Sequence, residues 1–247
     1  MAELFNNVTN KQGLIVYGGE ASTDYGIVVG DAPSFEKPTR RCTVFPVQGR
    51  NGSIIFQDGS YEDVTRNYNI WLADSPDKDL VESVDAMTSW LYSKTGYQRL
   101  EDSFEPDVFR LAYYNGGQEV VNHMLQYGET TLPFVCRPER FYKDAEQEQT
   151  VSNGDKIYNP TRFASKPLIH LEGSGSVSIS IQGTTMNATL SDYINIDVER
   201  MNAYRLPSEN KNSLISGSFP TIRPGTNTIA TTGTVTKVTI VPRYFTI

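Results

Sequence analysis

Alternating apolar and polar positions in the later part of the chain predict short, half-buried β-strands. Apolar side chains occupy every second position over 177–181 and 194–198, and a similar alternation over 235–240 ends at Pro242. Because successive side chains of a strand point to opposite faces, this period places one face in a core. Six glycines are predicted to supply the turns: Gly173, Gly175, Gly183, Gly217, Gly225 and Gly233. We therefore predict a β-sandwich for this part of the chain.

The earlier part of the chain shows the same pattern, together with a hairpin signal. Tyr68, Ile70 and Leu72 alternate with polar neighbours and predict a strand with one buried face. Segment 53–57 has the composition of a strand and lies between two turn signals, Gly49-Arg50-Asn51-Gly52 and Asp58-Gly59. Asn-Gly and Asp-Gly tolerate the positive φ angles of tight turns, so a turn is predicted on each side.

One amphipathic helix interrupts the strands. Ser75 can cap it, Pro76 fits its first turn, and Asp77 and Asp79 favour the positive end of its dipole. Apolar residues then recur at helical spacing: Leu80, Val84, Met87 and Leu91, with Val81 and Trp90 widening the stripe. Gly96 is a natural stop. The pattern predicts a helix of about 18 residues that packs on a sheet.

A length of 247 residues suits one large or two small domains, and a change in composition favours two. Both Trp, both Cys and most acidic residues precede residue 145, whereas Ser, Thr, Asn and Gly dominate after it. Segment 143–150 has no apolar periodicity and indicates a polar connector or an exposed edge. We predict a mainly β protein with one helix, with an N-terminal domain over 1–145 and a C-terminal domain over 146–247.

The distribution of charge excludes some functions. Residues 1–150 hold 13 Lys and Arg against 23 Asp and Glu, a net charge of −10, whereas 151–247 hold 9 against 6, a net charge of +3. Phosphate binding needs clustered cations, so sequence-specific DNA or RNA binding is excluded as the main function. We expect no membrane association, because no apolar run approaches the roughly 18 residues of a membrane helix. The first residues show no secretory signal, and Cys42 and Cys136 are expected to be reduced and buried.

No motif for catalysis or cofactor binding is evident. Gly173-Ser174-Gly175-Ser176 lacks the spacing of a nucleophile elbow, and His123 and His170 are far from both cysteines, so no zinc site is predicted. His170 lies in a predicted strand. The carboxylates that a glycosidase could pair are Asp58, Glu62, Asp63, Glu101, Asp102 and Glu105, but nothing marks two of them as partners. We predict no enzyme activity, no metal and no cofactor.

Stretches distributed along the chain, taken in order, resemble the distal tail proteins of long-tailed phages. The N-terminal stretches are Val47-Gln48-Gly49-Arg50-Asn51-Gly52 with Asp58-Gly59-Ser60-Tyr61, where the family commonly has Asp in place of Asn51, then Trp90-Leu91 and Phe134-Val135-Cys136-Arg137-Pro138. The C-terminal stretches begin with Asn159-Pro160-Thr161 and Ser165-Lys166-Pro167 and continue through Gly217-Ser218-Phe219-Pro220 and Pro224-Gly225-Thr226-Asn227 to Val238–Arg243. Their order is similar to that of the family's galectin-like C-terminal domain, and the resemblance covers nearly the whole chain.

The resemblance implies a structural protein of the virion. Members of the family form a homo-hexameric ring at the tail tip from N-terminal domains with a β-sandwich or split-barrel-like fold, and galectin-like β-sandwiches surround the ring. The ring joins the tail tube protein to the tail-tip hub protein and the adsorption apparatus. Its channel passes DNA without specific binding. Tape measure or receptor-binding proteins are further implied partners, and assembly would occur in the host cytoplasm.

Ring closure requires heterologous contacts between neighbouring copies, and a projecting hairpin offers unpaired edge groups. We therefore predict that part of the contact consists of Arg50, Asn51, Gly52, Asp58, Gly59 and Tyr61, and that Asn51→Pro impairs assembly. An acidic N-terminal domain also suits a channel wall that does not hold DNA. Two other functions stay open: a carbohydrate-binding module that recognises host-surface saccharide, and a cell-wall hydrolase. The C-terminal part has no Trp, the best platform for stacking a sugar.

Overall fold

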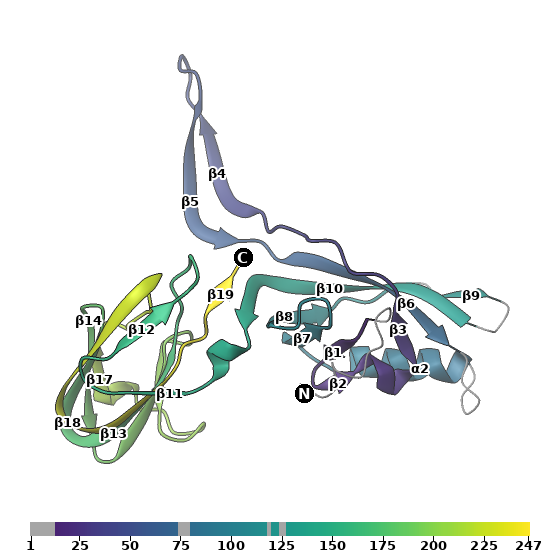
Figure 1. Cartoon of the computed structure of the whole chain (residues 1–247). Coiled ribbons are helices and arrows are strands. Elements are labelled where there is room, and N and C mark those ends of the chain that lie inside the picture. Colours follow the sequence, from purple (N-terminus) through teal and green to yellow (C-terminus); the bar gives the residue numbers. More distant parts are fainter. Residues whose placement is uncertain (1–12, 74–79, 118–119, 124–126) are drawn as a thin grey trace. The chain divides into compact units, whose positions relative to one another are not determined.

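The computed structural model describes residues 13–73, 80–117, 120–123 and 127–247. The chain divides into two compact units, of which the first runs to Arg140 and includes Ile247 and the second covers 141–246. Both units are mainly β, and the described residues contain one α-helix, α2 (Leu80–Tyr92), in the N-terminal unit (Figure 1). The predicted fold class is confirmed.

The N-terminal unit is a sheet whose two ends meet. Its strands are β1 (Ile15–Tyr17), β2 (Glu20–Ala21), β3 (Ile27–Val29), β6 (Val64–Ala73), β7 (Gln98–Asp102), β8 (Val108–Tyr114), β9 (Val121–His123) and β10 (Tyr127–Tyr142). They pair in the order β2-β1-β7-β8-β10-β6-β3, and β9 pairs with β10. Gly13, just before β1, and Val29 in β3 exchange backbone hydrogen bonds of 2.9 and 3.4 Å. These bonds close the curled sheet into a split barrel.

The interior of the barrel contains the residues that the alternation predicted. Tyr68, Ile70 and Leu72 on β6 are fully buried, as is Phe134 on the paired strand β10. The ring of Phe134 lies 4.9 Å from that of Tyr17, centroid to centroid. Burial of each such side chain contributes about 2 kcal/mol to folding, so these strands form the stable centre of the unit.

Helix α2 covers part of this core with one face. Leu80, Met87, Trp90 and Leu91 are buried, and the indole of Trp90 donates a 3.2 Å hydrogen bond to the Tyr17 carbonyl. Trp90 also stacks on Tyr25, which ends the 3-10 helix η1 (Ser22–Tyr25), with a centroid distance of 4.8 Å. The amphipathic stripe therefore packs as predicted.

Two details of the helix differ from the prediction. Val81 is exposed and Ser83 is buried in its place, because 83 lies three residues from 80 and four from 87, on the same side of the helix. The helix ends at Tyr92, before Gly96. The predicted start, with Ser75, Pro76, Asp77 and Asp79, lies outside the described residues.

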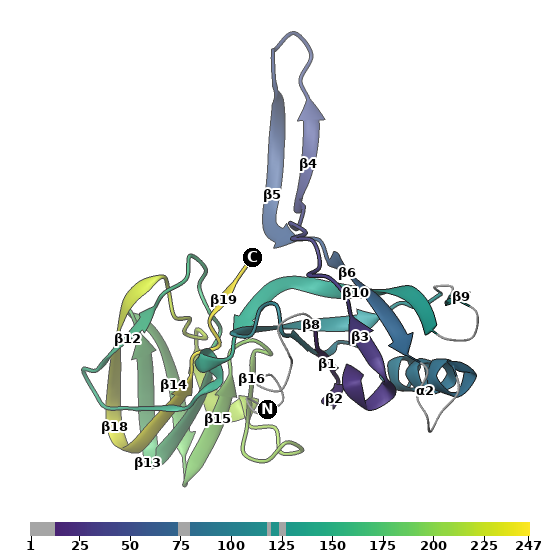
Figure 2. The same ribbon diagram turned by 45° about the vertical axis from the view of Figure 1, so that its right-hand side comes forward.

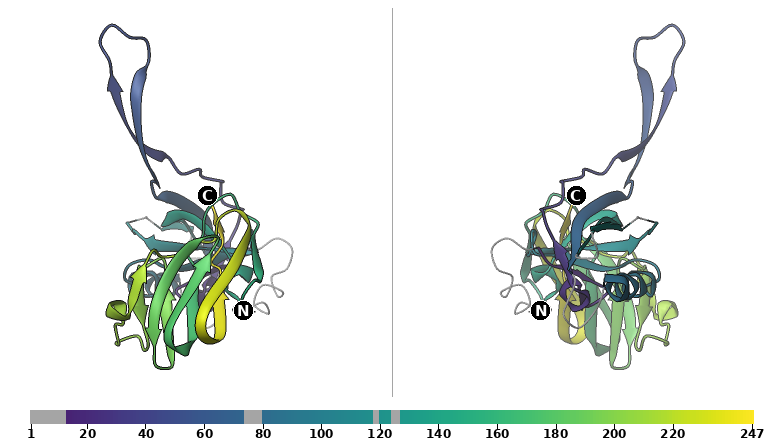
Figure 3. Two further views of the ribbon diagram at one scale, coloured as in Figure 1. Left: turned by 90° about the vertical axis from the view of Figure 1, so that its left-hand side faces the viewer. Right: turned by 90° about the vertical axis from the view of Figure 1, so that its right-hand side faces the viewer.

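The C-terminal unit is a sandwich built on two long strands. Its strands are β11 (Gln149–Val151), β12 (Lys156–Asn159), β13 (Leu168–Ile181), β14 (Thr184–Leu190), β15 (Tyr193–Asp197), β16 (Asn202–Tyr204), β17 (Ile215–Gly217), β18 (Gly225–Val241) and β19 (Phe245–Thr246); the 3-10 helices are η2 (Asp144–Glu146) and η3 (Asn212–Leu214). β13 and β18 pair side by side, seen as green and yellow strands in Figure 3. One half of this pair is flanked by β12, β14 and β17, and the other by β11, β15 and β16.

The apolar side chains that alternate with polar ones along these strands fill the space between the two layers. The buried residues include Val177, Ile179, Ile181, Ile194, Ile196, Val198, Val238 and Ile240, as predicted. Gly173 and Gly233 lie inside β13 and β18 rather than in turns. A Cβ at Gly173 would lie 2.3 Å from the Thr234 carbonyl oxygen, and the pairing register shifts at this point. The two strands therefore use glycine where their backbones approach closely on passing from one layer to the other, whereas Gly183 does lie in a turn.

Candidate functional site

A two-stranded arm in the N-terminal unit leaves large apolar side chains exposed. It consists of β4 (Arg40–Pro46) and β5 (Ser53–Tyr61), which pair with each other and with no other described strand (Figures 1 and 2). The exposed fraction is between 49% and 70% for five side chains, Val44, Phe45, Ile54, Ile55 and Phe56. An isolated hairpin is marginally stable in water, so the arm is suited to lie against a partner surface.

The register of the arm distributes these side chains over both of its faces. Val44 lies opposite Ile55, and Phe45 lies opposite Ile54. Opposed residues share a face and successive residues alternate, so the first pair lies on one face and the second pair, together with Phe56, on the other. A hairpin that covers a surface with one face would carry polar residues on the other. This arm has the composition of a strand pair enclosed on both sides.

The structure separates the six predicted contact residues into two groups. Arg50, Asn51 and Gly52 lie at the tip turn, whereas Asp58, Gly59 and Tyr61 lie in the last part of β5, about 20 Å away for a strand of this length. The predicted turn at the tip is present, with Gly49 and Gly52 at positive φ. The apolar side chains between the two groups were not among the predicted contacts, although the unbroken run 54–56 is a signal for a strand buried on both faces.

Asp58-Gly59 does not form the turn that the sequence predicted. It lies within β5, where the pairing with β4 becomes irregular, and Gly59 has a φ of +83°. The Asp58 carboxylate accepts hydrogen bonds from the Ser60 hydroxyl at 2.7 Å and the Ser60 N–H at 2.8 Å, and these bonds lower its pKa. The local hydrogen bonds therefore shape a bulge at the base of the arm instead of reversing the chain.

An arginine connects the two arm strands at the base of the arm, beside a groove. Arg40 donates to the Tyr61 hydroxyl at 3.0 Å, across the two arm strands. A groove of about 510 Å³ lies beside this base. Its lining residues are Thr39, Arg40, Arg41, Cys42, Thr43, Phe56, Asp58 and Glu62. The groove continues the exposed surface of the arm strands.

Three of the acidic residues that a hydrolase could use, Glu101, Asp102 and Glu105, are paired with arginines. Arg66 bonds to Asp102 at 2.9 Å and to Glu105 at 3.0 Å, so the structure brings these two carboxylates together. Burial raises the pKa of Glu105, but the hydrogen bond and charge of Arg110 and the other arginines outweigh it and hold the pKa below its usual value. A general acid needs the opposite shift. Glu101 pairs separately with Arg99, and Asp63 accepts a 2.5 Å hydrogen bond from Tyr97.

The two thiols have opposite environments. Cys136 is buried in the barrel, and burial raises its pKa to about 12. Cys42 is exposed on β4, which corrects the expectation that both are buried. The expectation for Cys42 failed because every residue of β4 is exposed. Both thiols are free, as expected.

A row of polar side chains lies on one face of the C-terminal unit. His170, which is in β13 as predicted, contacts Asn195 at 2.7 Å and Glu172 at 3.1 Å. The Tyr193 ring lies 5.2 Å from the His170 ring, and Arg205 lies 5.0 Å from its centroid. These groups are engaged with one another, so a ligand on this face would exchange existing hydrogen bonds for its own.

The described residues also lack features of a metal site and of a membrane-spanning helix. In the described ranges, no group of His, Cys, Asp and Glu side chains could hold a metal ion. No helix among the described residues is long and apolar enough to cross a bilayer.

Comparison with known proteins shows the fold. No protein-family model and no curated protein matches the sequence. The crystal structure of the Dit protein (gp 19.1) of SPP1, described as a paradigm of the hub adsorption apparatus of phages that infect Gram-positive bacteria, matches with a TM-score of 0.76 at 12% identity, over 95% of this chain and 99% of that one. A chain of the phage P2 baseplate in its activated conformation with Ca matches with a TM-score of 0.52 at 10% identity, over 94% and 98%. Over 95% of its length, which includes both units, the chain therefore has the fold of a phage distal tail protein.

Proposed function

We propose that the chain is a structural subunit of a phage tail tip, or baseplate, and that six copies form a ring. The ring joins the tail tube protein to the tail-tip hub and the adsorption apparatus, in contact with tape measure or receptor-binding proteins, and its channel passes DNA. The observation that carries the proposal is the two-faced apolar arm. The arm is part of a chain whose structure matches that of the SPP1 Dit protein over 95% of this chain's length.

The arm supports self-assembly because of its composition. A ring closes through heterologous contacts, in which one surface of each copy meets a different surface of the next. An arm with apolar side chains on both faces supplies such a surface. Enclosing these five large side chains, whose exposed fractions lie between 49% and 70%, contributes on the order of 5 kcal/mol per arm before the cost of association. In this proposal the residues at its two ends, among them Arg50, Asn51 and Tyr61, border the contact.

The charge of the N-terminal unit supports a channel that passes DNA. Its sequence carries far more Asp and Glu than Lys and Arg. A lumen lined by this unit would repel the phosphate backbone and let the genome slide. A ring structure with a basic channel wall would contradict this part of the proposal.

The oligomeric state tests the proposal directly. Six copies of a 27.6 kDa chain have a mass of about 166 kDa, which size-exclusion chromatography with light scattering separates from a monomer. We expect the ring mass for the wild type alone, or at least that mass when the tail tube and hub proteins are added, and a lower mass for Phe56→Asp on the arm. The matched control is Tyr158→Asp, which changes an aromatic residue of similar exposure (65%) in the C-terminal unit. A wild type that stays monomeric even with its tail partners would refute the proposal.

A second candidate function, binding of host saccharide by the C-terminal unit, is favoured by the polar row around His170. Its ring, amide and carboxylate groups surround the aromatic ring of Tyr193, a combination that suits hydroxyl groups and the apolar face of a sugar. Binding of cell-wall glycan by the purified protein, lost in Tyr193→Ala but kept in Tyr158→Ala, would support this function. No binding by the wild type would exclude it.

A further inference from the structure

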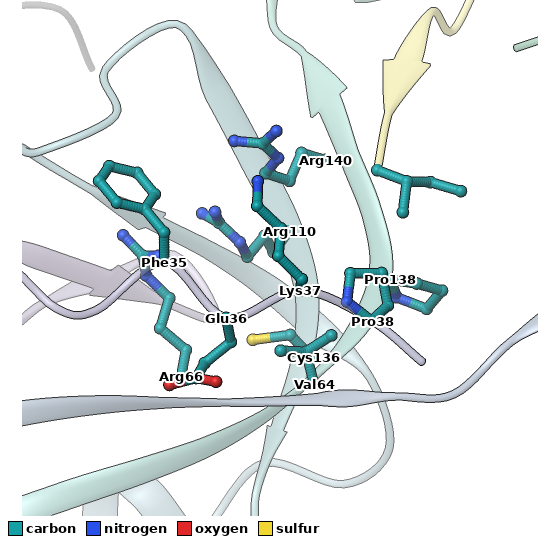
Figure 4. A pocket seen from close by; sticks show the side chains of 11 residues that line it. Phe35, Glu36, Lys37, Pro38, Val64, Arg66, Arg110, Cys136, Pro138 and Arg140 are labelled. Atoms are coloured by element: carbon teal, nitrogen blue, oxygen red, sulfur yellow. The ribbon is translucent and has the colours of Figure 1, made fainter. Parts of the chain in front are cut away.

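A small cavity in the N-terminal unit has one cationic wall and one apolar wall. Its volume is about 30 Å³. In Figure 4 the guanidinium groups of Arg66, Arg110 and Arg140 gather on one side, and Pro38 and Pro138 lie on the other. Segment 35–38 leads from β3 toward the first arm strand and lines the same cavity. The cavity is therefore formed by the strands of the barrel and by the segment that carries the arm.

The three guanidinium groups are already arranged around a carboxylate. Glu105 accepts from Arg66 at 3.0 Å, from Arg110 at 2.5 Å and from Arg140 at 2.9 Å. Arg66 is additionally fixed by Asp102 and by the Tyr68 hydroxyl, at 2.9 and 2.8 Å. A buried guanidinium held in this way keeps its orientation when a second carboxylate arrives, so the site is preorganised.

The guanidinium groups at the cavity have more N–H donors than the neighbouring carboxylates use. Each guanidinium has five N–H donors, and the described partners of Arg110 and Arg140 take one from each. Lys37 adds a fourth cation. The side-chain carboxylates at or beside the cavity are Glu36, Asp102 and Glu105, and Ile247 also lines the cavity.

We propose that this cavity binds the carboxylate of an Asp or Glu side chain presented by another protein chain. A cavity of about 30 Å³ holds roughly two water-sized groups, which matches the two oxygens of a carboxylate. A phosphate brings four oxygens and exceeds this space. The apolar wall suits the methylene groups of an acidic side chain. The site does not depend on the proposed ring, because its groups all belong to one N-terminal unit.

Thermal unfolding of the full chain in acetate tests the site. Acetate is the side chain of Asp without its backbone, and a ligand that binds the folded state alone raises the midpoint. We expect the midpoint in sodium acetate to exceed that in sodium chloride of equal concentration at pH 7.5, by about 3 °C at tenfold the dissociation constant and by more at higher concentrations. Equal midpoints in acetate and chloride over the whole series would overturn the proposal.

Three variants assign the response to the cavity. Arg140→Gln and Lys37→Gln remove one cation each and should abolish the difference between the two salts. Arg137→Gln is the matched control, because Arg137 lies on the same strand and pairs with Glu139 away from Glu105. It should keep the full difference. Lys37 has no bond to Glu105 among the described contacts, so Lys37→Gln remains informative if Arg140→Gln fails to fold. An acetate response that both cavity variants retain would refute the site.

Two further measurements identify the class of ligand and the protein that presents it. Sodium phosphate that stabilises the chain as acetate does, through the same residues, would overturn the carboxylate assignment. Light scattering in acetate then distinguishes the sources. A mass that falls toward the monomer indicates that a second copy presents the acidic side chain, and an unchanged mass indicates another tail protein. The acetate response is independent of ring formation, so the site and the proposed function fail separately.

Discussion

Gly233 in β18 lies so close to Ser176 in β13 that a Cβ at position 233 would be 2.3 Å from the Ser176 carbonyl oxygen. Gly233 also has a φ of +82°, which L side chains rarely adopt. The backbone of the paired strand cannot retreat cheaply, because it forms the ladder that both layers share.

Gly233→Ala should therefore destabilise the C-terminal unit by about 3 kcal/mol, through both the clash and the strained backbone. The measurement is chemical denaturation followed by far-ultraviolet circular dichroism. Gly175→Ala is the control, because Gly175 has a φ of +74° with nothing within 4 Å of its Cβ position. It should show the backbone strain alone, about 1 kcal/mol. Equal effects of the two substitutions would contradict the close approach.

Glu105→Gln should destabilise the N-terminal unit by about 3 kcal/mol, since it removes the charge shared by two buried guanidinium groups, Arg66 and Arg110, and by the partly buried Arg140. Both tryptophans, Trp71 and Trp90, belong to this unit, so their fluorescence during denaturation reports on it alone. Glu209→Gln, at an exposed pair with Lys211, should leave the transition unchanged. A transition of Glu105→Gln that coincides with the wild type would show that the cluster does not stabilise the unit.

The same cluster gives the N-terminal unit a defined response to acid. The pKa of Glu105 is lower in the folded chain than its ordinary value, so this carboxylate stabilises the fold fully above about pH 4.3, and its contribution is lost as the pH falls toward the folded pKa. Tryptophan fluorescence should show a decrease in stability below about pH 4.5. Glu105→Gln, with no carboxyl at this position, should give a shallower decrease. Parallel pH profiles of the two proteins would contradict this assignment.

The two thiols should react at very different rates with a disulfide reagent. Cys42 is exposed, whereas Cys136 is buried and its pKa is raised to about 12. In the native protein we expect one fast thiol, absent from Cys42→Ser, and a second thiol only after denaturation. Cys42 should also react more slowly in an assembled ring than in a monomeric arm variant. Fast reaction of both thiols in the native state would contradict the described burial of Cys136.

The two faces of the arm allow a sharper test of how it is enclosed. Ile55→Asp changes one face and Phe45→Asp the other. Because both residues are exposed, neither substitution should lower the unfolding midpoint of the monomer. If the arm is enclosed on both sides, each variant alone should reduce the assembled mass in light scattering. Loss of assembly from one face only would restrict the contact to that face.

Much of the fold could be predicted because burial follows the alternation of residues. Tyr68, Ile70 and Leu72 on β6, and Val177, Ile179 and Ile181 on β13, lie on the faces that the pattern assigned. The glycines were harder to place. In the sequence, Gly173 and Gly233 cannot be told apart from glycines in turns. The structure requires glycine at both positions because two long strands approach closely there. The strands are far apart in sequence, so no local pattern indicates this contact.

The arm was the least predictable feature, although its strand and tip turn were anticipated. The run 54–56 has the composition of a buried strand. The residues around it do not show whether such a strand lies in the core of its own chain or is exposed for contact with another chain. Asp58-Gly59 likewise has a turn composition, but the Ser60 hydrogen bonds and the pairing with β4 make it a bulge. The arginine cluster around Glu105 draws on β6, β8 and β10, so no sequence spacing indicates it.

The pairing of β13 with β18 also determines how the C-terminal unit withstands force. The ladder runs from Leu168 opposite Val241 to Ile181 opposite Ile229, and each strand contributes to both layers. Tension directed along the two strands would load the rungs of this ladder together, whereas a terminal hairpin opens one rung at a time. Mechanical resistance of the unit should thus come from shear of this ladder, with the register shifts at Gly173 and between Ser174 and Ser178 as its weakest points.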